Sequence, residues 1–449
     1  MKPREIALKV LMDMRQKGAY SNYSINKYLN QKIEPKDEGL VREIVYGVIE
    51  NLTYIDYIIS KLSKKKIEKI HPIILDILRI GVYQIAFMDK IPARAAVNEA
   101  VNLGKKYLHK GAAGFINGIL RNFSRRKDEL MKIRSKDKLE FLSIKYSHPQ
   151  WLINRWIKAY EEEFTEELLK ANNSRSKLNL RVNTLKTDKD TLIKALADYG
   201  YIAYETKYAK DGIVVENPVR ITEIEEFKKG HFTIQDESSM LVGQIANPTE
   251  NSVILDLCSA PGGKATHLAQ LMNNKGRIIC WDIYEHKLEL VRENANRLGI
   301  DIIETRLQDA QILDKDMIEI ADICIVDAPC SGLGIIRRRP EIKWNRKEKD
   351  IEALVKLQKN ILKNASKYVK PGGLLIYSTC TIEEKENIDM VKEFLNENKA
   401  FTLSAFDGLI NCDEKMETSK DGYIQMFPHI HGTDGFFIAR IRKKNNKNS

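Results

Sequence analysis

Apolar residues recur every three or four positions along the first part of the chain. Ile6, Val10 and Met14 show this spacing at the start, and similar apolar stripes follow as far as about residue 130. The period is typical of helices that bury one face, whereas half-buried strands alternate with a period of two. Because no alternating run interrupts the segment, we predict an all-α helical bundle over residues 1–130.

The pattern changes twice after this bundle. Residues 131–147 are rich in charge and carry little apolar signal, which is typical of a linker. Short strand candidates then alternate with one helix over residues 148–234, which predicts a small α/β subdomain. From residue 235 to residue 443 the alternation of strands and helices becomes regular, and residues 444–449 form a basic tail.

The regular part predicts a doubly wound α/β domain. Apolar runs of strand length are separated by segments with helical spacing, as in a parallel sheet that helices cover on both faces. The strands are expected at 252–257, 277–282, 302–306, 322–327 and 373–378, with helices near 264–272, 285–298 and 349–369.

A glycine turn follows the first of these strands, in the stretch VILDLCSAPGGK. It lacks the dinucleotide fingerprint, and a P-loop would need glycine in place of Cys258 and a hydroxyl residue in place of Ala265. A strand, a tight turn and a helix nevertheless form a ligand cradle at the carboxyl end of a parallel strand. The candidate cradle residues are Cys258, Ser259, Ala260, Pro261, Gly262, Gly263 and Lys264.

Two acidic residues lie where the next two strands end. Asp282 closes the second strand, where a carboxylate accepts hydrogen bonds from a ribose diol. Asp309 follows the third strand, where it would accept from an adenine amino group. The combination fits a nucleoside without a pyrophosphate, and the segment resembles the Rossmann-like methyltransferases. That resemblance implies S-adenosyl-L-methionine as the cofactor.

Two cysteines follow the fourth and fifth strands. Cys330 comes shortly after Asp327, and Cys380 comes just after the fifth strand. Because neighbouring strands lie about 4.8 Å apart, both thiols are expected at one crevice. A thiolate can add to C6 of a pyrimidine and so make C5 reactive enough to accept a methyl group. Asp327 is placed to stabilise charge at N3 during the addition, as an acid that is protonated or shares a proton with the base.

The residues around these features resemble two groups of proteins. Similarity to the RNA cytosine-C5 methyltransferases is carried by LDLCSAPGGKATHLA, DAPCSGLGIIRRRPEIKW, YSTCTIEEKEN and DGFFIARI. Similarity to the NusB family of RNA-binding helical domains is carried by LRIGVYQIAFMDKIPARAAVNEAVNLGKKY and GFINGILRN. Together these segments identify the chain as a member of the Sun/RsmB family, which methylates a cytosine of bacterial 16S ribosomal RNA.

The family resemblance implies roles for individual residues. Cys380 is the nucleophile and Cys330 assists release of the product. The cradle residues bind the cofactor together with Asp282, Asp309 and Asp327, and the family target is cytosine-967. We therefore expect a Rossmann-like methyltransferase domain in a monomeric protein. Its partner is expected to be 16S ribosomal RNA, alone or within a partly assembled small subunit.

The charge balance agrees with a polyanionic partner. The chain has 73 Lys and Arg residues against 62 Asp and Glu residues, which gives a net charge of +11. Basic residues surround an aromatic residue shortly after Cys330, a combination that fits a nucleic-acid backbone and a stacked base. The candidate RNA-contact residues are Arg337, Arg338, Arg339, Lys343 and Trp344.

Composition excludes several other classes of protein. Six cysteines in 449 residues do not form a disulfide scaffold, and none has C-x-x-C spacing, so no metal site is expected. The start of the chain lacks the apolar core of a signal peptide, and charged residues interrupt its most apolar long segment. We therefore expect no membrane span and a cytoplasmic location.

Alternatives remain open on the residues alone. The core motifs do not encode the RNA, so a transfer RNA or another RNA would suit the same chemistry. A non-catalytic RNA-binding or antitermination factor would keep the fold but would not need the pair Cys330 and Cys380. A methyltransferase that acts on an amino group would not need Cys380.

Overall fold

The computed structural model describes residues 1–17, 20–29, 34–216 and 218–445. The chain divides into two compact units: unit 1 is Met1–Ser174 with Ile336–Arg346, and unit 2 is Arg175–Ile335 with Lys347–Ser449. Most of the predicted basic tail, residues 446–449, lies outside the described residues. None of the described helices is long and apolar enough to span a membrane.

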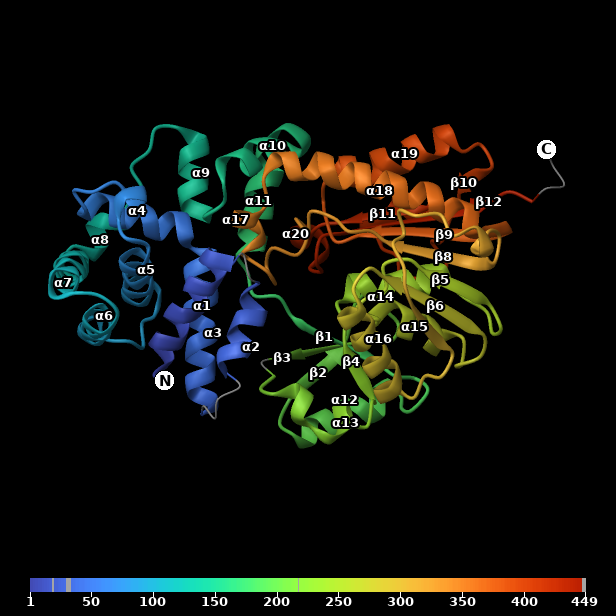
Figure 1. Ribbon diagram of the computed structural model, residues 1–449, viewed down its shortest axis with the longest axis horizontal. Helices are drawn as coiled ribbons and strands as arrows, with labels where there is room; N and C mark the ends of the chain where they lie inside the picture. Colours follow the sequence, from blue (N-terminus) through green and yellow to red (C-terminus); the bar gives the residue numbers. More distant parts are fainter. Residues whose placement is uncertain (18–19, 30–33, 217, 446–449) are drawn as a thin grey trace. The chain divides into compact units, whose positions relative to one another are not determined.

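Unit 1 is built from helices wherever the structure describes it, which confirms the all-α prediction (Figure 1). Its apolar stripes meet in one core, where Ile44, Ile58 and Leu78 are fully buried. The predicted linker contains α9, and both α10 and α11 belong to unit 1. The α-helices are α1 (Pro3–Lys17), α2 (Ser21–Leu29), α3 (Pro35–Glu50), α4 (Leu52–Leu62), α5 (Pro72–Phe87), α6 (Ala93–Tyr107), α7 (Lys110–Arg125), α8 (Lys127–Leu130), α9 (Lys138–Tyr146), α10 (Gln150–Tyr160) and α11 (Glu162–Asn172).

The segment Ile336–Arg346 belongs to unit 1 although its neighbours in sequence on both sides belong to unit 2. It contains the short helix α17 (Ile342–Asn345), and Trp344 packs against the apolar core of unit 1. The carboxyl group of Glu341 accepts hydrogen bonds from the backbone nitrogen and the hydroxyl of Ser21, at 3.1 and 2.9 Å. These contacts fasten the segment to the helical unit.

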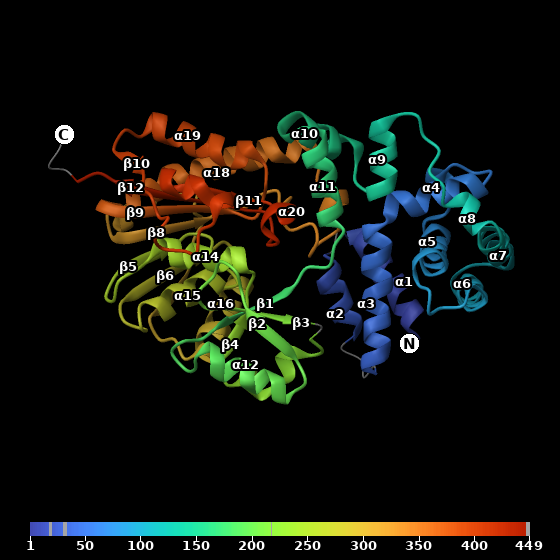
Figure 2. The same cartoon turned by 180° about the vertical axis from the view of Figure 1, so that it is seen from behind.

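The first part of unit 2 is a small antiparallel sheet with helices on one face (Figure 2). Its strand order is β2-β3-β1-β4. Leu180, Leu196 and Phe232 are buried between the sheet and the helices. The elements are β1 (Leu178–Val182), α12 (Lys189–Asp198), β2 (Ile202–Glu205), β3 (Gly212–Glu216), α13 (Glu225–Lys228) and β4 (Phe232–Ile234).

The rest of unit 2 surrounds a large sheet with the strand order β10-β12-β9-β8-β5-β6-β7, and β11 pairs with β12. The five expected strands are β5 to β9, which run parallel to one another. β12 pairs antiparallel with β9. The strands are β5 (Val253–Asp256), β6 (Arg277–Asp282), β7 (Ile303–Leu307), β8 (Ala321–Asp327), β9 (Val369–Thr379), β10 (Phe401–Leu403), β11 (Tyr423–Met426) and β12 (Phe436–Lys443).

Helices cover both faces of the large sheet, as Figure 1 shows. One face packs on a core that includes Leu241, Leu268 and Val291, and the other on a core that includes Ile361 and Phe394. This two-sided burial explains the near-continuous apolar runs of the parallel strands and confirms the doubly wound prediction. The helices are α14 (Glu237–Ala246), α15 (Gly263–Leu271) and α16 (Glu285–Leu298) on one face, α18 (Glu348–Tyr368) and α19 (Ile388–Glu397) on the other, and α20 (Pro428–His431).

The strand order creates a switch point between β5 and β8. The chain leaves β5 toward β6 but returns on the other side of β5 as β8, and ligands bind outside the carboxyl ends of the strands at such a point. The register of β8 and β9 sets Asp327 opposite Ser378. The candidate residues that follow β5, β8 and β9 therefore lie at the same end of the sheet, where the parallel strands have their carboxyl ends.

Candidate active site

Backbone hydrogen bonds hold the turn between β5 and α15. Gly262 has a φ of 94°, a conformation that favours glycine, and its N–H donates to the Ser259 carbonyl oxygen at 2.7 Å. Ser259 in turn donates from its backbone nitrogen to the carbonyl oxygen of Trp281, at the end of β6. The cradle residues are thus tied to each other and to the neighbouring strand.

Carboxyl groups surround this turn. Asp256 is fully buried at the end of β5, and burial raises its pKa to about 7. One of its carboxyl oxygens, Oδ2, has no hydrogen-bond partner among the described residues. The charges of Asp327 and Asp282 raise the pKa of Asp256 further, whereas the Lys264 ammonium and the Cys258 backbone N–H lower it. Such a group of acids suits a ligand that carries positive charge.

The two acids predicted to bind a nucleoside lie at neighbouring strand ends. The Gln308 N–H donates to the Asp282 carbonyl oxygen, which joins the end of β7 to that of β6. The Asp282 carboxyl group accepts from the Tyr284 N–H at 3.0 Å, and that of Asp309 accepts from the Gln311 N–H at 2.8 Å. Both carboxyl groups therefore shape their own turns at the sheet edge.

Lys264 and Asp327 form an ion pair beside the turn. The Lys264 ammonium donates to one Asp327 carboxyl oxygen at 2.6 Å, and the Ser378 hydroxyl donates to the other at 2.8 Å. Burial alone would lower the pKa of Lys264, but the Asp327 carboxylate raises it above its usual value. The Phe436 ring lies 5.4 Å from the same ammonium. Asp327 thus accepts two hydrogen bonds, one from the Lys264 ammonium and one from the Ser378 hydroxyl.

The two predicted thiols lie side by side. Their Sγ atoms, of Cys330 and Cys380, are 3.3 Å apart, within hydrogen-bond distance for sulfur. The hydrogen bond to Cys380, followed by burial, raises the pKa of Cys330 well above its usual value. The expected proximity of the two side chains is therefore observed.

Backbone contacts join the two cysteine loops to the last strand. The Gly334 N–H donates to the Cys380 carbonyl oxygen at 3.1 Å, and the Gly435 N–H donates to the Gly334 carbonyl oxygen at 2.9 Å. A Cβ atom on Gly334 would lie only 1.9 Å from the Gly435 carbonyl oxygen. The close approach therefore requires glycine at position 334.

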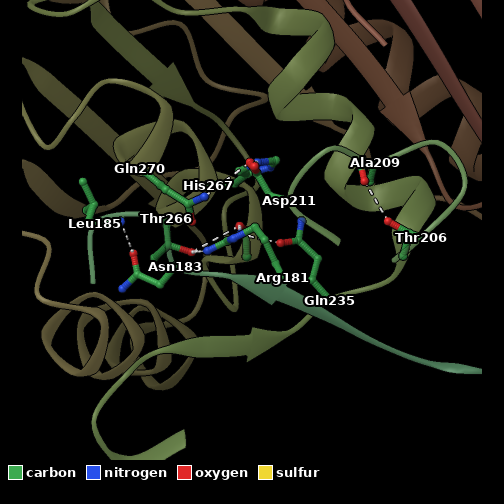
Figure 3. A network of polar contacts seen from close by, with 11 residues as sticks. Arg181, Asn183, Leu185, Thr206, Ala209, Asp211, Gln235, Thr266, His267 and Gln270 are labelled. Atoms are coloured by element: carbon green, nitrogen blue, oxygen red, sulfur yellow. Dashed lines mark hydrogen bonds and ion pairs between the residues drawn. The ribbon is translucent and has the colours of Figure 1, made fainter. Parts of the chain in front are cut away.

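A buried guanidinium links the small sheet to the glycine turn (Figure 3). Arg181 projects from β1 and donates to the side-chain oxygen of Gln235. It also donates to the Gly263 carbonyl oxygen and the Thr266 hydroxyl, which belong to the first turn of α15. Burial lowers the pKa of Arg181 to about 9. The small sheet thereby holds the helix that begins at the glycine turn.

Two further side chains of α15 contact the small subdomain. Figure 3 shows His267 and Gln270 directed at Asp211, and each side-chain Nε2 atom lies 3.3 Å from the same carboxyl oxygen. Burial lowers the pKa of His267 to about 4, so the imidazole is neutral near pH 7. The contact between His267 and Asp211 is therefore a hydrogen bond of a neutral imidazole near pH 7, and it helps to hold α15 against the small sheet.

The basic loop after Cys330 differs from the expectation of a solvent-facing RNA contact. Lys343 is fully buried, and its ammonium donates to the Glu50 carbonyl oxygen and the Asn173 side-chain oxygen at 3.1 and 3.3 Å. Burial lowers its pKa to about 7. The Trp344 indole N–H donates to the Ile49 carbonyl oxygen at 2.9 Å. Lys343 is thus buried and Trp344 half-buried, and both side chains contribute to the packing of unit 1.

The three arginines of this loop, unlike Lys343, are at least partly exposed. Arg339 is exposed, and its guanidinium carbon lies 5.6 Å from the centre of the Tyr20 ring. Arg337 and Arg338 are half-buried. The arginines, but not Lys343, therefore remain candidates for RNA contact.

Models of known families match three successive parts of the chain. The NusB family model matches residues 1–125, and a model of the ferredoxin-like domain of RsmF/B-like methyltransferases matches residues 148–222. The model of the 16S rRNA methyltransferase RsmB/F matches residues 243–442. These matches agree with the helical unit, the small sheet and the doubly wound domain.

Curated relatives cover the whole chain. The probable ribosomal RNA small subunit methyltransferase B of Bacillus subtilis is 37% identical, over 98% of each chain. This chain belongs to that methyltransferase family. The ribosomal RNA small subunit methyltransferase B of Photorhabdus laumondii is 33% identical, again over 98% of each chain.

Solved structures agree with this assignment. The crystal structure of PH0851 covers 99% of each chain with a TM-score of 0.83 at 27% identity. NSun6 from Pyrococcus horikoshii, solved with SFG, covers 66% of this chain and 99% of its own, with a TM-score of 0.59 at 25% identity. The family fold therefore extends over both units.

Sequence reasoning missed several residues of this site. Arg181 carries a recognisable signal, because an arginine within an apolar strand needs buried acceptors. Ser378 could have been found from the register of β8 and β9, which sets it opposite Asp327. Asp256 ends the first apolar strand as Asp282 ends the second, so the same argument would have selected it.

Proposed function

We propose that this protein methylates carbon 5 of a cytosine in 16S ribosomal RNA, at the family position cytosine-967, through a covalent bond between Cys380 and the base. One observation carries the proposal: two thiols follow adjacent strand ends with their Sγ atoms 3.3 Å apart, beside the cofactor turn. Methyl transfer to an amine or a hydroxyl needs no such pair, whereas C5 of a pyrimidine must first be activated.

S-adenosyl-L-methionine supplies the methyl group on a positively charged sulfur. The acids around the glycine turn fit that charge, and Asp256 offers a buried oxygen without a partner. Asp282 and Asp309 are proposed for the ribose and the adenine, and the backbone of the turn for the rest of the ligand. The solved NSun6 structure, which contains the S-adenosylmethionine analogue SFG, supports this cofactor.

The chain's own residues activate the base. The Cys380 thiolate adds its electron pair to C6, and the pair of the C5–C6 double bond moves into the ring toward N3. The Lys264 ammonium, held by Asp327 at 2.6 Å, donates the proton that neutralises this charge. C5 then has the electron density to accept a methyl group.

Cys330 is proposed to complete the reaction. Its Sγ atom lies 3.3 Å from that of Cys380, so it lies beside the base once the Cys380 sulfur is bonded to C6. Cys330 can then lose its proton to water and remove the proton from C5. The C–H electron pair re-forms the C5–C6 double bond, and the Cys380 sulfur leaves with the pair of the C6–S bond. N3 returns its proton to the Lys264 amine, which restores the ammonium and the neutral base.

Bisulfite sequencing of 16S ribosomal RNA, from cells with and without the gene, tests both the substrate and the position. We expect one cytosine to lose methylation, at position 967. If methylation is lost from a different RNA, the proposed substrate is wrong but the proposed chemistry stands. For the mechanism, Cys380→Ala should abolish turnover and retain cofactor binding, and Cys330→Ala should trap a protein–RNA adduct on denaturing gels. Turnover by Cys380→Ala would contradict the covalent step.

A further inference from the structure

Two buried side chains form hydrogen bonds with the peptide groups on either side of Cys330. The proposed mechanism does not use these two side chains. The side-chain N–H of Gln358 donates to the Pro329 carbonyl oxygen at 2.9 Å. A carboxyl oxygen of Glu386 accepts from the backbone N–H of Ser331 at 2.9 Å. The carbonyl before Cys330 and the amide after it are therefore both fixed by side chains.

The two side chains are joined to each other. The same Gln358 nitrogen donates to the Glu386 carboxyl group at 2.8 Å, and both residues are fully buried. Gln358 comes from the middle of α18, whereas Glu386 lies six positions after Cys380. The Tyr377 hydroxyl donates to the Glu386 carbonyl oxygen at 2.7 Å, which fixes the backbone of this acid as well. We name Gln358 and Glu386 the loop clamp.

The loop clamp acts on the geometry between the two thiols. The hydroxyls of Ser331 and Thr381, each next to a cysteine in sequence, are 2.7 Å apart. The clamp therefore holds the Cys330 loop from behind while this hydroxyl pair ties it to the Cys380 loop. An exposed loop would need no buried acid, because water could satisfy its peptide groups.

We propose that Glu386 and Gln358 are positioning residues, which hold the Cys330 thiol where it can reach the proton on C5 after methyl transfer. The inference rests on the proposed covalent mechanism and assigns a residue pair to its last step. In that step the Cys330 thiolate takes the C5 proton, and the C–H electron pair forms the C5–C6 double bond. The Cys380 sulfur then departs with the C6–S pair.

A positioning role predicts a selective defect. Glu386→Leu fills the space but removes the acceptor for the Ser331 N–H, so the Cys330 loop should shift. We expect release of the adduct to slow roughly 10- to 100-fold, because displacements of about 1 Å have effects of this size. Cofactor affinity and methyl transfer in the first turnover should stay at wild-type values, since Cys380 and the cofactor turn are untouched.

The experiment uses the full-length protein, S-adenosylmethionine and an unmethylated 16S ribosomal RNA transcript. Single-turnover methyl transfer and decay of the adduct on denaturing gels are measured separately, and cofactor binding is measured by calorimetry. Glu386→Gln keeps an oxygen that can accept both hydrogen bonds and should restore release. Glu384→Gln is the matched control, because Glu384 is an exposed acid of the same short helix.

The outcomes separate this inference from the proposed function. An adduct with Cys330→Ala but wild-type release with Glu386→Leu would overturn only the positioning role. The positioning role would also be overturned if Glu386→Leu lost cofactor binding and first-turnover methyl transfer as much as release. Absence of an adduct with Cys330→Ala would instead overturn the release mechanism. If Glu386→Leu does not fold, Gln358→Met decides, because it removes only the donor to Pro329 and Glu386. Wild-type release by that variant would refute the proposal.

Discussion

The glycine turn after β5 and the segment Ile336–Arg346 each bury a lysine side chain, with opposite effects on its pKa. Beside the turn, the Asp327 carboxylate lies 2.6 Å from Lys264 and raises its pKa although burial opposes this. In the segment, the Lys343 ammonium donates to a carbonyl oxygen and an amide oxygen, and burial lowers its pKa to about 7. The partner therefore decides whether a buried charge persists.

This difference separates a chemical role from a structural one. A paired ammonium remains charged at neutral pH and can donate a proton to a substrate that reaches it. A buried lysine that is not paired with a carboxylate loses its charge more easily and mainly satisfies acceptors within the fold. Both lysines belong to segments that the sequence marks as candidate binding sites, so the segment alone does not distinguish them.

The largest expected effect comes from replacing each lysine by methionine, which keeps the length of the side chain. Lys264→Met should lower single-turnover methylation by roughly 10²- to 10⁴-fold, because the proposed proton donor for the base is lost. Lys343→Met is the matched control and should leave the rate close to wild type. Incorporation of labelled methyl groups into the RNA measures both. Equal losses of methylation rate in the two variants would show that the two lysines do not differ in role.

A smaller effect concerns stability against pH. The pKa of Lys343 is about 7 when folded, below its ordinary value of 10.5, so the unfolded chain binds more protons between these values. Stability should therefore rise with pH above 7, by up to about 1.4 kcal/mol per pH unit. The neighbouring His148 has a lowered pKa and does not titrate in this range.

Urea denaturation of wild type and Lys343→Met, compared between pH 7 and 8.5, measures this contribution. The methionine variant should lack the rise, so the difference in stability between the two proteins should change with pH. Lys264→Met should retain the rise, because the pKa of Lys264 is raised and that group stays protonated in the window. Parallel curves for wild type and Lys343→Met would show that Lys343 keeps an ordinary pKa.

The smallest expected effect distinguishes the exposed and buried parts of the basic loop. Arg339→Ala should weaken RNA binding a few-fold and reduce the slope of log affinity against log salt by about one, as for a lost phosphate contact. Lys343→Met should change neither quantity. Binding of the 16S ribosomal RNA transcript at several salt concentrations measures both. A reduced slope for Lys343→Met would place that ammonium on the RNA.

Most of the fold followed from apolar periodicity. The helical stripes predicted the all-α part of unit 1, and the five apolar runs correspond to β5–β9. The short strands β10 and β11 were not predicted, because three or four residues paired to β12 carry too weak a pattern. Their existence depends on a partner strand that is distant in sequence.

The site was predictable where function needs a particular residue next to a strand end. The proximity of Cys330 and Cys380 follows from adjacent parallel strands, and the glycine turn follows from its own sequence. The burial of Lys343 was not predictable, since its acceptors at Glu50 and Asn173 are remote in the chain. Glu386 lies in a run of charges that is typical of a solvated surface.

The contact between Gly334 and Gly435 has a mechanical consequence. Three segments remote in sequence meet there through peptide groups alone, because the Cys380 carbonyl, Gly334 and Gly435 are linked in a row by two backbone hydrogen bonds. No side chain stands between them to absorb a displacement by rotating. If Cys380 bonds to the base as proposed, a movement of its backbone would therefore be transmitted directly to the start of β12.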